Sequence, residues 1–311
     1  MGLYFKDYMI VVPPITLTTD NTTSTVPEPS AGEVEWVSGT AYTKGQVVIR
    51  SLTHKKYECI TDNNSTSPPE LNFTQWLDIG PTNKWAMFDN LRSKKTITQG
   101  SMEITVTSGK RIDSVALMGL EAKTVKVWMV VGGVTVWGPE ERNMTGRNTT
   151  TWSEYFFGEF KYVPTLLFKN LPPYSGATIH IEITNDPALN VACSEVIVGK
   201  KTYIGAAQYN AVSDSLNFSK IDRDEFGNTL LKQRRTVPKA RVTTIAKKGL
   251  TNKIREVREE LNAVPALWSA LDDNFTDPYF EALFIYGVYK QFEIDISEPN
   301  STTINLELEE M

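Results

Sequence analysis

The sequence predicts a mainly β protein with a small α+β part at its C-terminal end. Residues 101–107 alternate between apolar and polar side chains, as expected of a half-buried strand. Gly132 and Gly133 separate two apolar runs, which is typical of a β-hairpin turn. The best helical period in the chain lies in residues 251–262. The expected order is a small β unit, a β-sandwich of the jelly-roll kind, and then one helix against a sheet.

Length and composition allow two or three globular domains. The chain has 311 residues, of which 41% are hydrophobic and 22% are charged. A formal net charge of -5 argues against a nucleic-acid partner. We expect no membrane span, because no run of about 18 apolar residues is present. The N-terminus also lacks the apolar stretch of a signal peptide. Cys59, Cys193, His54 and His180 are too few and too scattered for a disulfide framework, a metal site or a cofactor site.

Residues 1–30 are expected to form a strand followed by an extended arm. Residues 4–12 are largely apolar and β-prone, whereas the segment up to Ser30 is rich in proline and small polar residues. Such residues bury too little surface to offset chain entropy, so we expect no domain core of its own here. The arm then either lies along a neighbouring subunit, adding a strand to it, or is mobile.

Residues 31–79 are the first compact unit that we expect. Two short strands, residues 47–50 and 56–60, surround a polar turn. A unit of about 50 residues buries little surface, so large aromatic side chains must supply its core. Flat rings also offer a face on which a pyranose can stack, so glycan binding is the second interpretation of the same residues. Both interpretations concern four aromatic residues: Trp36, Tyr42, Tyr57 and Trp76.

Residues 80–200 are predicted to form the β-sandwich. Strands that follow one another at short intervals, separated by turns, are typical of a sandwich or jelly roll. In the first clear strand, Met102, Ile104 and Val106 share one face. Further strands are expected at residues 112–119, 125–131, 134–137, 165–168 and 178–183.

Residues 201–311 are predicted to form the α+β part. Residues 225–228 have the composition of a turn between polar strands. The helix is expected to begin with Thr251 as its N-cap and to end before Pro265. Strands are expected again at residues 284–289 and 303–309. The apolar face of the helix comprises Ile254, Val257 and Leu261.

The sequence offers no catalytic constellation. A glycosidase needs two carboxylates across a cleft, but Glu140–Glu141 and Asp272–Asp273 are sequence neighbours, which we assign to the surface. Asp222–Glu225 begins like a calcium loop, yet the acidic spacing after Gly227 does not match an EF-hand. No phosphate loop, nucleophile elbow or zinc motif occurs. We therefore expect no catalytic residue, no metal and no enzyme activity.

Two segments resemble known families. The spacing of Trp36, Tyr42, Gly45, Val48, Tyr57 and Trp76 is similar to that of the chitin-binding type of carbohydrate-binding module. The segment from Gly80 to Asp89 resembles a signature of bacteriophage tail-associated structural proteins. Within that segment, Trp85, Met87 and Phe88 are expected to attach the first unit to the sandwich. Further segments similar to the phage family are Gln208–Tyr209, Asp224–Asn228 and Tyr286–Lys290.

The resemblance implies a non-enzymatic virion protein that is assembled in the host cytoplasm. Its expected role is that of a tail, baseplate or fibre-attachment adaptor, with glycan contact as a secondary role. The implied partners are other tail proteins, further copies of the chain and a host-surface glycan. The alternative is a carbohydrate-active enzyme that carries an accessory binding module.

Overall fold

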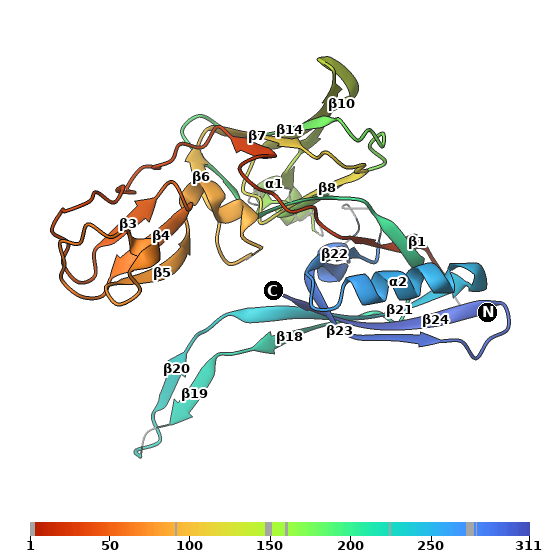
Figure 1. The fold of residues 1–311 in the computed structure, drawn as a ribbon. Coiled ribbons are helices and arrows are strands. Elements are labelled where there is room, and N and C mark those ends of the chain that lie inside the picture. The colour runs from red at the N-terminus through yellow and green to blue at the C-terminus, as the bar shows by residue number, and fades with distance from the viewer. Residues whose placement is uncertain are drawn as a thin grey trace.

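The computed structural model describes residues 4–90, 92–146, 151–158, 161–223, 225–271, 277 and 279–311. The chain is mainly β, with many antiparallel sheets and a helix near the C-terminal end that packs against a sheet, which confirms the predicted fold class. Figure 1 shows a sandwich, a small module beside it, and a third unit below them from which a ribbon projects. No helix in the described ranges is long and apolar enough to cross a membrane.

The sandwich consists of two main antiparallel sheets around one hydrophobic core. The first sheet has five strands in the order β10 (Val134–Asn143), β9 (Thr124–Val131), β14 (Thr178–Thr184), β7 (Ser101–Thr107) and β2 (Thr22–Ser24). The second has the order β13 (Thr165–Lys169), β8 (Ser114–Met118) and β16 (Glu195–Gly199). Gly132 and Gly133 join β9 to β10 with φ of 56° and 82°, the backbone that favours glycine in a tight hairpin. Short pairs complete this unit: β6 (Thr96–Gln99) with β15 (Asn190–Cys193), and β11 (Thr145–Gly146) with β12 (Lys161–Tyr162).

The sheet β13-β8-β16 is buried on both faces. Val115 and Leu117 belong to the sandwich core, whereas Ala116 and Met118 belong to the core of the third unit. The same division separates Val196 from Ile197 on β16. Because both faces are covered, β8 is a continuous apolar run rather than an alternating one.

The third unit is a closed ring of six antiparallel strands. Strand β17 pairs with β1 on one side and with β21 on the other, so the hydrogen-bonded order returns to its start. We call this unit the ring. Its order is β17 (Thr202–Gln208), β1 (Tyr4–Val12), β22 (Ala266–Ser269), β23 (Phe284–Asp295), β24 (Ser301–Glu310) and β21 (Thr236–Lys247).

Helix α2 (Thr251–Glu260) packs against the ring through the predicted face. Ile254, Val257 and Leu261 are all buried in the ring core. The predicted N-cap is wrong: the 3-10 turn η3 (Lys248–Leu250) leads directly into the helix, and Leu250 occupies the cap position. Thr251 is the first helical residue, and its hydroxyl donates to the carbonyl oxygen of Lys248 instead. A further 3-10 turn, η4 (Glu281–Leu283), precedes β23.

The N-terminal segment contributes to the cores of two units of the same chain. Met9 to Val12 are buried in the ring core, where β1 lies between β17 and β22. The following segment crosses the sandwich of the same chain, with the amide of Ile15 donating to the carbonyl of Val198 at 2.8 Å. β2 then extends the five-stranded sheet, and Val26 is buried in the sandwich core. Strands β1 and β2 therefore pair with strands of the same chain, whereas we expected the pairing partner on a neighbouring subunit.

The small module contains the two predicted strands and one more. Its sheet has the order β3 (Val47–Arg50), β4 (Lys55–Cys59) and β5 (Trp76–Pro81), with the 3-10 turn η1 (Pro69–Leu71) before β5. A second turn, η2 (Asn83–Phe88), leads from the module to the sandwich. The turn between β3 and β4 lacks glycine, and His54 adopts the left-handed conformation there with φ of 56°.

A two-stranded ribbon projects from the ring on the side away from α2 (Figure 1). It starts where β18 (Val212–Asn217) pairs with the first half of β21, and it continues as β19 (Lys220–Arg223) and β20 (Thr229–Lys232). We call residues 212–235 the arm; this is a different segment from the extended arm expected within residues 1–30. The predicted turn lies at its tip, although Asp224 is outside the described residues. Arg235, at the end of the arm, forms an ion pair with Glu310 of the ring at 3.3 Å.

Candidate functional site

The four aromatic residues proposed from the sequence lie together in the core of the module. Trp36, Tyr42, Tyr57 and Trp76 are 8%, 7%, 3% and 1% exposed and form one cluster with Val48 and Cys59. The edge of Tyr42 meets Trp76 with ring centroids 5.2 Å apart. Burial on this scale supports the core interpretation, because a pyranose needs an open ring face on which to stack.

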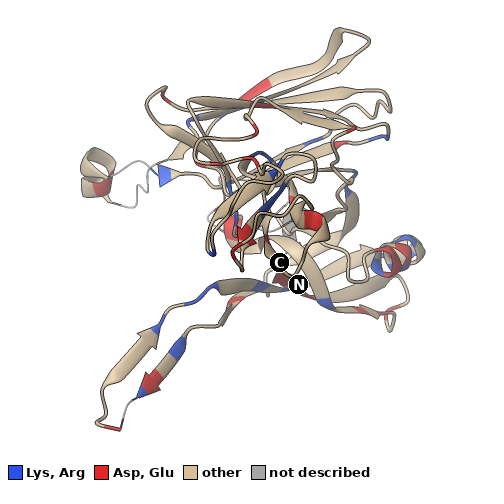
Figure 2. Cartoon of the chain, turned by 60° about the vertical axis from the view of Figure 1, so that its left-hand side comes forward, with Lys and Arg blue, Asp and Glu red and all other residues tan. Residues whose placement is uncertain are grey.

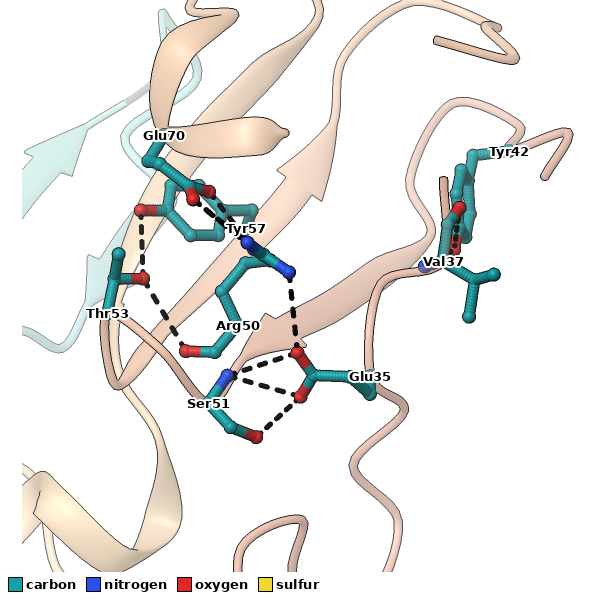
Figure 3. A network of polar contacts seen from close by, with 8 residues as sticks. All are labelled: Glu35, Val37, Tyr42, Arg50, Ser51, Thr53, Tyr57 and Glu70. Carbon is teal, nitrogen blue, oxygen red and sulfur yellow. Dashed lines mark hydrogen bonds and ion pairs between the residues drawn. The ribbon is translucent and has the colours of Figure 1, made fainter. Parts of the chain in front are cut away.

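A polar network covers this aromatic core, and Arg50 is its centre (Figure 3). The guanidinium lies over the ring of Trp36 at 5.1 Å and pairs with Glu70 at 3.1 Å and Glu35 at 3.7 Å. The backbone amide and the hydroxyl of Ser51 both donate to the Glu35 carboxylate. Burial acts to raise the pKa of Glu70, but the hydrogen bond from Arg50, a backbone hydrogen bond and the charge of Arg50 together outweigh it and lower that pKa below its usual value. Every charge in this network is used within the module, which is the pattern of a structural network rather than of a binding site.

Phe73 is the aromatic side chain of the module that faces solvent. It is 74% exposed, and the neighbouring Leu71 is exposed too. Both follow the Pro68–Pro69 turn at η1. The spaced aromatic pattern of the sequence did not include Phe73. Its position in a polar loop directly before Thr74 could have identified it as a surface ring.

The predicted attachment of the module to the sandwich is confirmed. His54 stacks on Trp85 with ring centroids 4.4 Å apart, and Trp85 meets Phe88 edge to face at 5.4 Å. Met87 is buried in the sandwich core. Glu28 accepts from the hydroxyl of Thr82 at 2.6 Å and pairs with His54 at 2.9 Å. Residues 80–89 therefore connect the module to the sandwich.

A buried acidic cluster lies between the sandwich and the ring. Glu195 is 2% exposed and has the same strand parity as Ile197, so it faces the ring. Burial, and then the charge of Asp89, raise the pKa of Glu195 to about 9. The hydroxyl of Tyr286 donates to the side-chain oxygen of Asn90 in the same cluster. Glu195 is therefore protonated at neutral pH.

A cavity of about 260 Å³ adjoins this acidic cluster. A protonated carboxyl beside a second acid is the arrangement that general acid catalysis uses. The cavity is smaller than the usual ligand pocket of about 300–1,000 Å³, and the sequence analysis did not predict it. Residues from four separate segments line it: Ile15, Leu17, Phe88, Asn90, Glu195 and Pro265.

The other candidates for chemistry are not brought together. Glu140 forms an ion pair with Arg142 two residues away on β10, and Asp272–Asp273 lie outside the described residues. Cys59 and Cys193 are free and buried, and burial raises the pKa of the Cys193 thiol to about 12. Within the described residues, no group of three or more histidine, cysteine or acidic side chains could hold a metal ion.

Helix α1 and the arm both expose several large apolar side chains. Helix α1 (Trp152–Phe157) buries none of its residues and exposes four aromatic rings, with Trp152 and Phe156 stacked 6.1 Å apart. The arm exposes Phe226, which is 88% accessible, and several aliphatic residues. Large exposed apolar surfaces on projecting elements mark interaction sites. The exposed apolar residues of the arm are Val212, Phe218, Ile221, Phe226, Leu230 and Leu231.

Comparison of this chain with protein-family models, with curated proteins and with solved structures found no match.

Proposed function

We propose that this chain is a non-enzymatic structural protein of a bacteriophage virion, which assembles in several copies as a tail, baseplate or fibre-attachment adaptor. The proposal starts from the resemblance of residues 80–89 to tail-associated proteins. The connecting role of that segment supports it, because Trp85 and Met87 attach one unit to the next. Other tail proteins and copies of the chain itself are the proposed partners, and the virion is the proposed location.

The observation that carries the proposal is the exposed apolar surface of the arm. A two-stranded ribbon is only marginally stable alone in water. This ribbon nevertheless exposes Ile221 and Leu231, a directly paired couple, together with Phe226 at its tip. An assembly that covers the arm would stabilise it, whereas an enzyme that acts as a monomer has no need of it.

Glycan contact is the secondary role in this proposal. With Trp36, Tyr42, Tyr57 and Trp76 buried, such a contact would use Phe73 and its neighbour Leu71. We expect Phe73→Ala to reduce retention on immobilised chitin or cell-wall polysaccharide without lowering the melting temperature. Equal retention of the parent and the variant would exclude Phe73 from this role, and no retention of the parent would exclude glycan contact by the module.

Mass spectrometry of purified phage particles tests the structural role. The particles would be prepared from a host that carries the gene and separated from free protein by density-gradient centrifugation. We expect peptides of this chain at a constant ratio to those of other tail proteins across the gradient peak. Absence of the chain from intact particles would contradict the proposal.

The acidic cluster at Glu195 favours the alternative, a carbohydrate-active enzyme. Its test is an assay of reducing ends released from cell-wall polysaccharide by the parent chain and by Glu195→Gln. The structural proposal expects no release from either chain. Release by the parent that Glu195→Gln abolishes would establish the enzyme instead.

A further inference from the structure

We propose that the arm is an assembly element whose tip docks into an apolar groove on a second copy of this chain. The groove lies on the ring, at the far end of the strand from which the arm arises. This inference rests on the multi-copy role proposed above and names the surfaces through which copies meet. Its test does not depend on finding the chain in virions.

The tip of the arm, residues 222–228, combines an aromatic anchor with acidic charge. Among its described residues, Asp222 pairs with Lys220 at 2.9 Å, and Glu225 is the acidic side chain next to the aromatic one. Phe226 is 88% exposed beside the exposed Glu225. An aromatic side chain flanked by charge is a typical anchor for a pocket on a partner.

The groove lies between strands β1 and β17 on one side and the end of β21 on the other. It has a volume of about 500 Å³, within the usual range for ligand pockets. Tyr8 and Tyr203 meet edge to face at 5.8 Å on one wall. The opposite wall contains Ile245 and Leu250. Tyr8, Tyr203 and Leu250 are all exposed, so the wall offers apolar surface that this copy does not cover.

Lysine side chains lie at the groove and near it, so its charge complements that of Glu225 at the tip. Lys247 lines it, and Lys248 follows in the sequence, exposed like Lys247. The ammonium of Lys201 lies 5.5 Å from the ring centroid of Tyr203. An apolar groove with a basic rim suits an aromatic side chain beside Glu225. Figure 2 shows acidic residues at the end of the projecting arm.

The tip and the groove of one copy are too far apart to meet. The arm joins β21 at Thr236, whereas the groove is formed at Ile245 to Lys247 of the same strand. Eleven residue steps of an extended strand span roughly 35–40 Å, and Figure 1 shows the arm pointing away from that end. The contact is therefore between copies. Because tip and groove are different surfaces, the copies meet either reciprocally in a closed pair or head to tail in a larger array.

Disulfide trapping with the full chain tests this arrangement. Asn228→Cys places a thiol at the tip and keeps Phe226 and Glu225, and Leu250→Cys places one at the groove. Cys59 and Cys193 are buried, so they form no background cross-links. Each variant would be oxidised alone and as a 1:1 mixture, and the products would be separated without reducing agent. A disulfide forms only where the two Cα atoms approach to about 4.4–6.8 Å.

We expect the mixture to give a covalent two-chain product that contains one tip variant and one groove variant. The chain with both substitutions should give a two-chain product if the copies pair reciprocally and a ladder of products if they join head to tail, because each copy then presents a tip and a groove. Cross-links within each variant alone, at the same yield as in the mixture, would overturn the proposal. The absence of any tip-to-groove product at millimolar protein would overturn it as well.

Charge exchange separates a specific contact from random collision. Glu225→Lys or Lys247→Glu alone should reduce the yield of tip-to-groove product at least fivefold, and the two together should restore it. The matched control is Glu141→Lys on β10, which is exposed but far from both surfaces, and it should change nothing. Equal yields from all variants would show that the charges do not direct the contact. If the chain is found in virions but gives no trapped product, only this inference fails.

Discussion

At the scale of single residues, burial separates the roles of two aromatic side chains that lie three positions apart. Trp76 is 1% exposed and packs in the module core, whereas Phe73 is 74% exposed on the preceding loop. Both are large apolar residues, and their chemistry alone does not distinguish core from contact. Their positions relative to the sheet do, because Trp76 begins β5 and Phe73 precedes it.

Trp76→Ala should therefore destabilise the module, and Phe73→Ala should not. Removing a buried tryptophan costs about 3–5 kcal/mol through lost burial and the cavity left behind. A surface truncation usually costs less than about 0.5 kcal/mol. Chemical denaturation of the full chain, followed by tryptophan fluorescence and circular dichroism, measures both. Equal stability of Trp76→Ala and the parent would mean that this residue is not part of the core.

Glu195 gives a pH-dependent prediction. Its pKa is raised from 4.5 to about 9, so the folded state keeps a proton that the unfolded state loses. The contribution of this proton to the free energy of unfolding is fully present below pH 4.5 and is lost as the pH rises toward 9. Glu195→Gln cannot ionise, so its melting temperature should exceed that of the parent by more at pH 8 than at pH 5.

The size of this effect follows from the shift, since each pKa unit corresponds to about 1.4 kcal/mol. A difference of a few kcal/mol between the two pH values is expected. Glu141→Gln, at an exposed position, is the matched control and should leave the pH profile unchanged. A parallel shift of Glu195→Gln at both pH values would show that the carboxyl is not held protonated.

At the scale of elements, helix α2 demonstrates how a sequence period becomes a packed face. Ile254 and Val257 are one turn apart and both are buried, whereas Arg255 and Glu256 between them are exposed. The helical period of the sequence predicted the buried face of α2 correctly but not its N-cap. The hydroxyl of Thr251 interacts with Lys248 and with Thr302 of β24, contacts that depend on tertiary structure.

Val257→Asp should unfold the ring or lower its stability strongly. The substitution places an unpaired charge in the apolar contact between α2 and the ring, and such burial is expensive. Arg255→Asp changes the charge by two units rather than one, but on the exposed face, and should have little effect. Thermal unfolding of both variants gives the comparison. Similar melting temperatures for Val257→Asp and Arg255→Asp would mean that the buried face is assigned wrongly.

Strand β1 gives a second prediction at this scale. Removing residues 1–12 would leave the edges of β17 and β22 unpaired and would open the ring. We expect the shortened chain to aggregate or to lose its cooperative unfolding transition. In the intact chain, proteases should not cleave within Met9–Val12, since all four residues are buried and lie between β17 and β22. Rapid cleavage in that interval in a verified monomer would contradict the inclusion of β1 in the ring.

At the scale of the whole molecule, the sequence predicted the elements better than their connections. Alternation and turn residues identified strands such as β7, and helix α2 was predicted with its buried face, whereas the short helix α1 was not predicted. The closure of the ring was not predicted, because it depends on the pairing of β1 with β17 across almost 200 residues. The apolar run of β8 marked a strand, but its pattern did not show that two different cores would use its two faces.

The candidate site was only partly predictable for the same reason. The aromatic spacing located the module core correctly. The spacing alone does not show whether these rings are buried or exposed, because that depends on how the loop before β5 folds. Glu195 is a single glutamate in an apolar strand, and its partner Asp89 is over 100 residues away. Only the packing of the sandwich against the ring brings these acids together.

The arm gives a prediction that separates folding from assembly. Asn217 and Thr236 are directly paired at the base of the arm. Replacing residues 218–235 with an Asn-Gly turn therefore closes a normal hairpin there.

The removed segment adds no residue to the ring core, so we expect the melting temperature to change by less than about 2 °C. Arg235 and its ion pair with Glu310 are lost, but the buried Glu310 carboxylate keeps its ion pair with Arg92. The same deletion should abolish self-association measured by light scattering, and it should prevent incorporation into particles. A large loss of thermal stability would show that the arm supports the fold, and normal incorporation would show that copies meet through another surface.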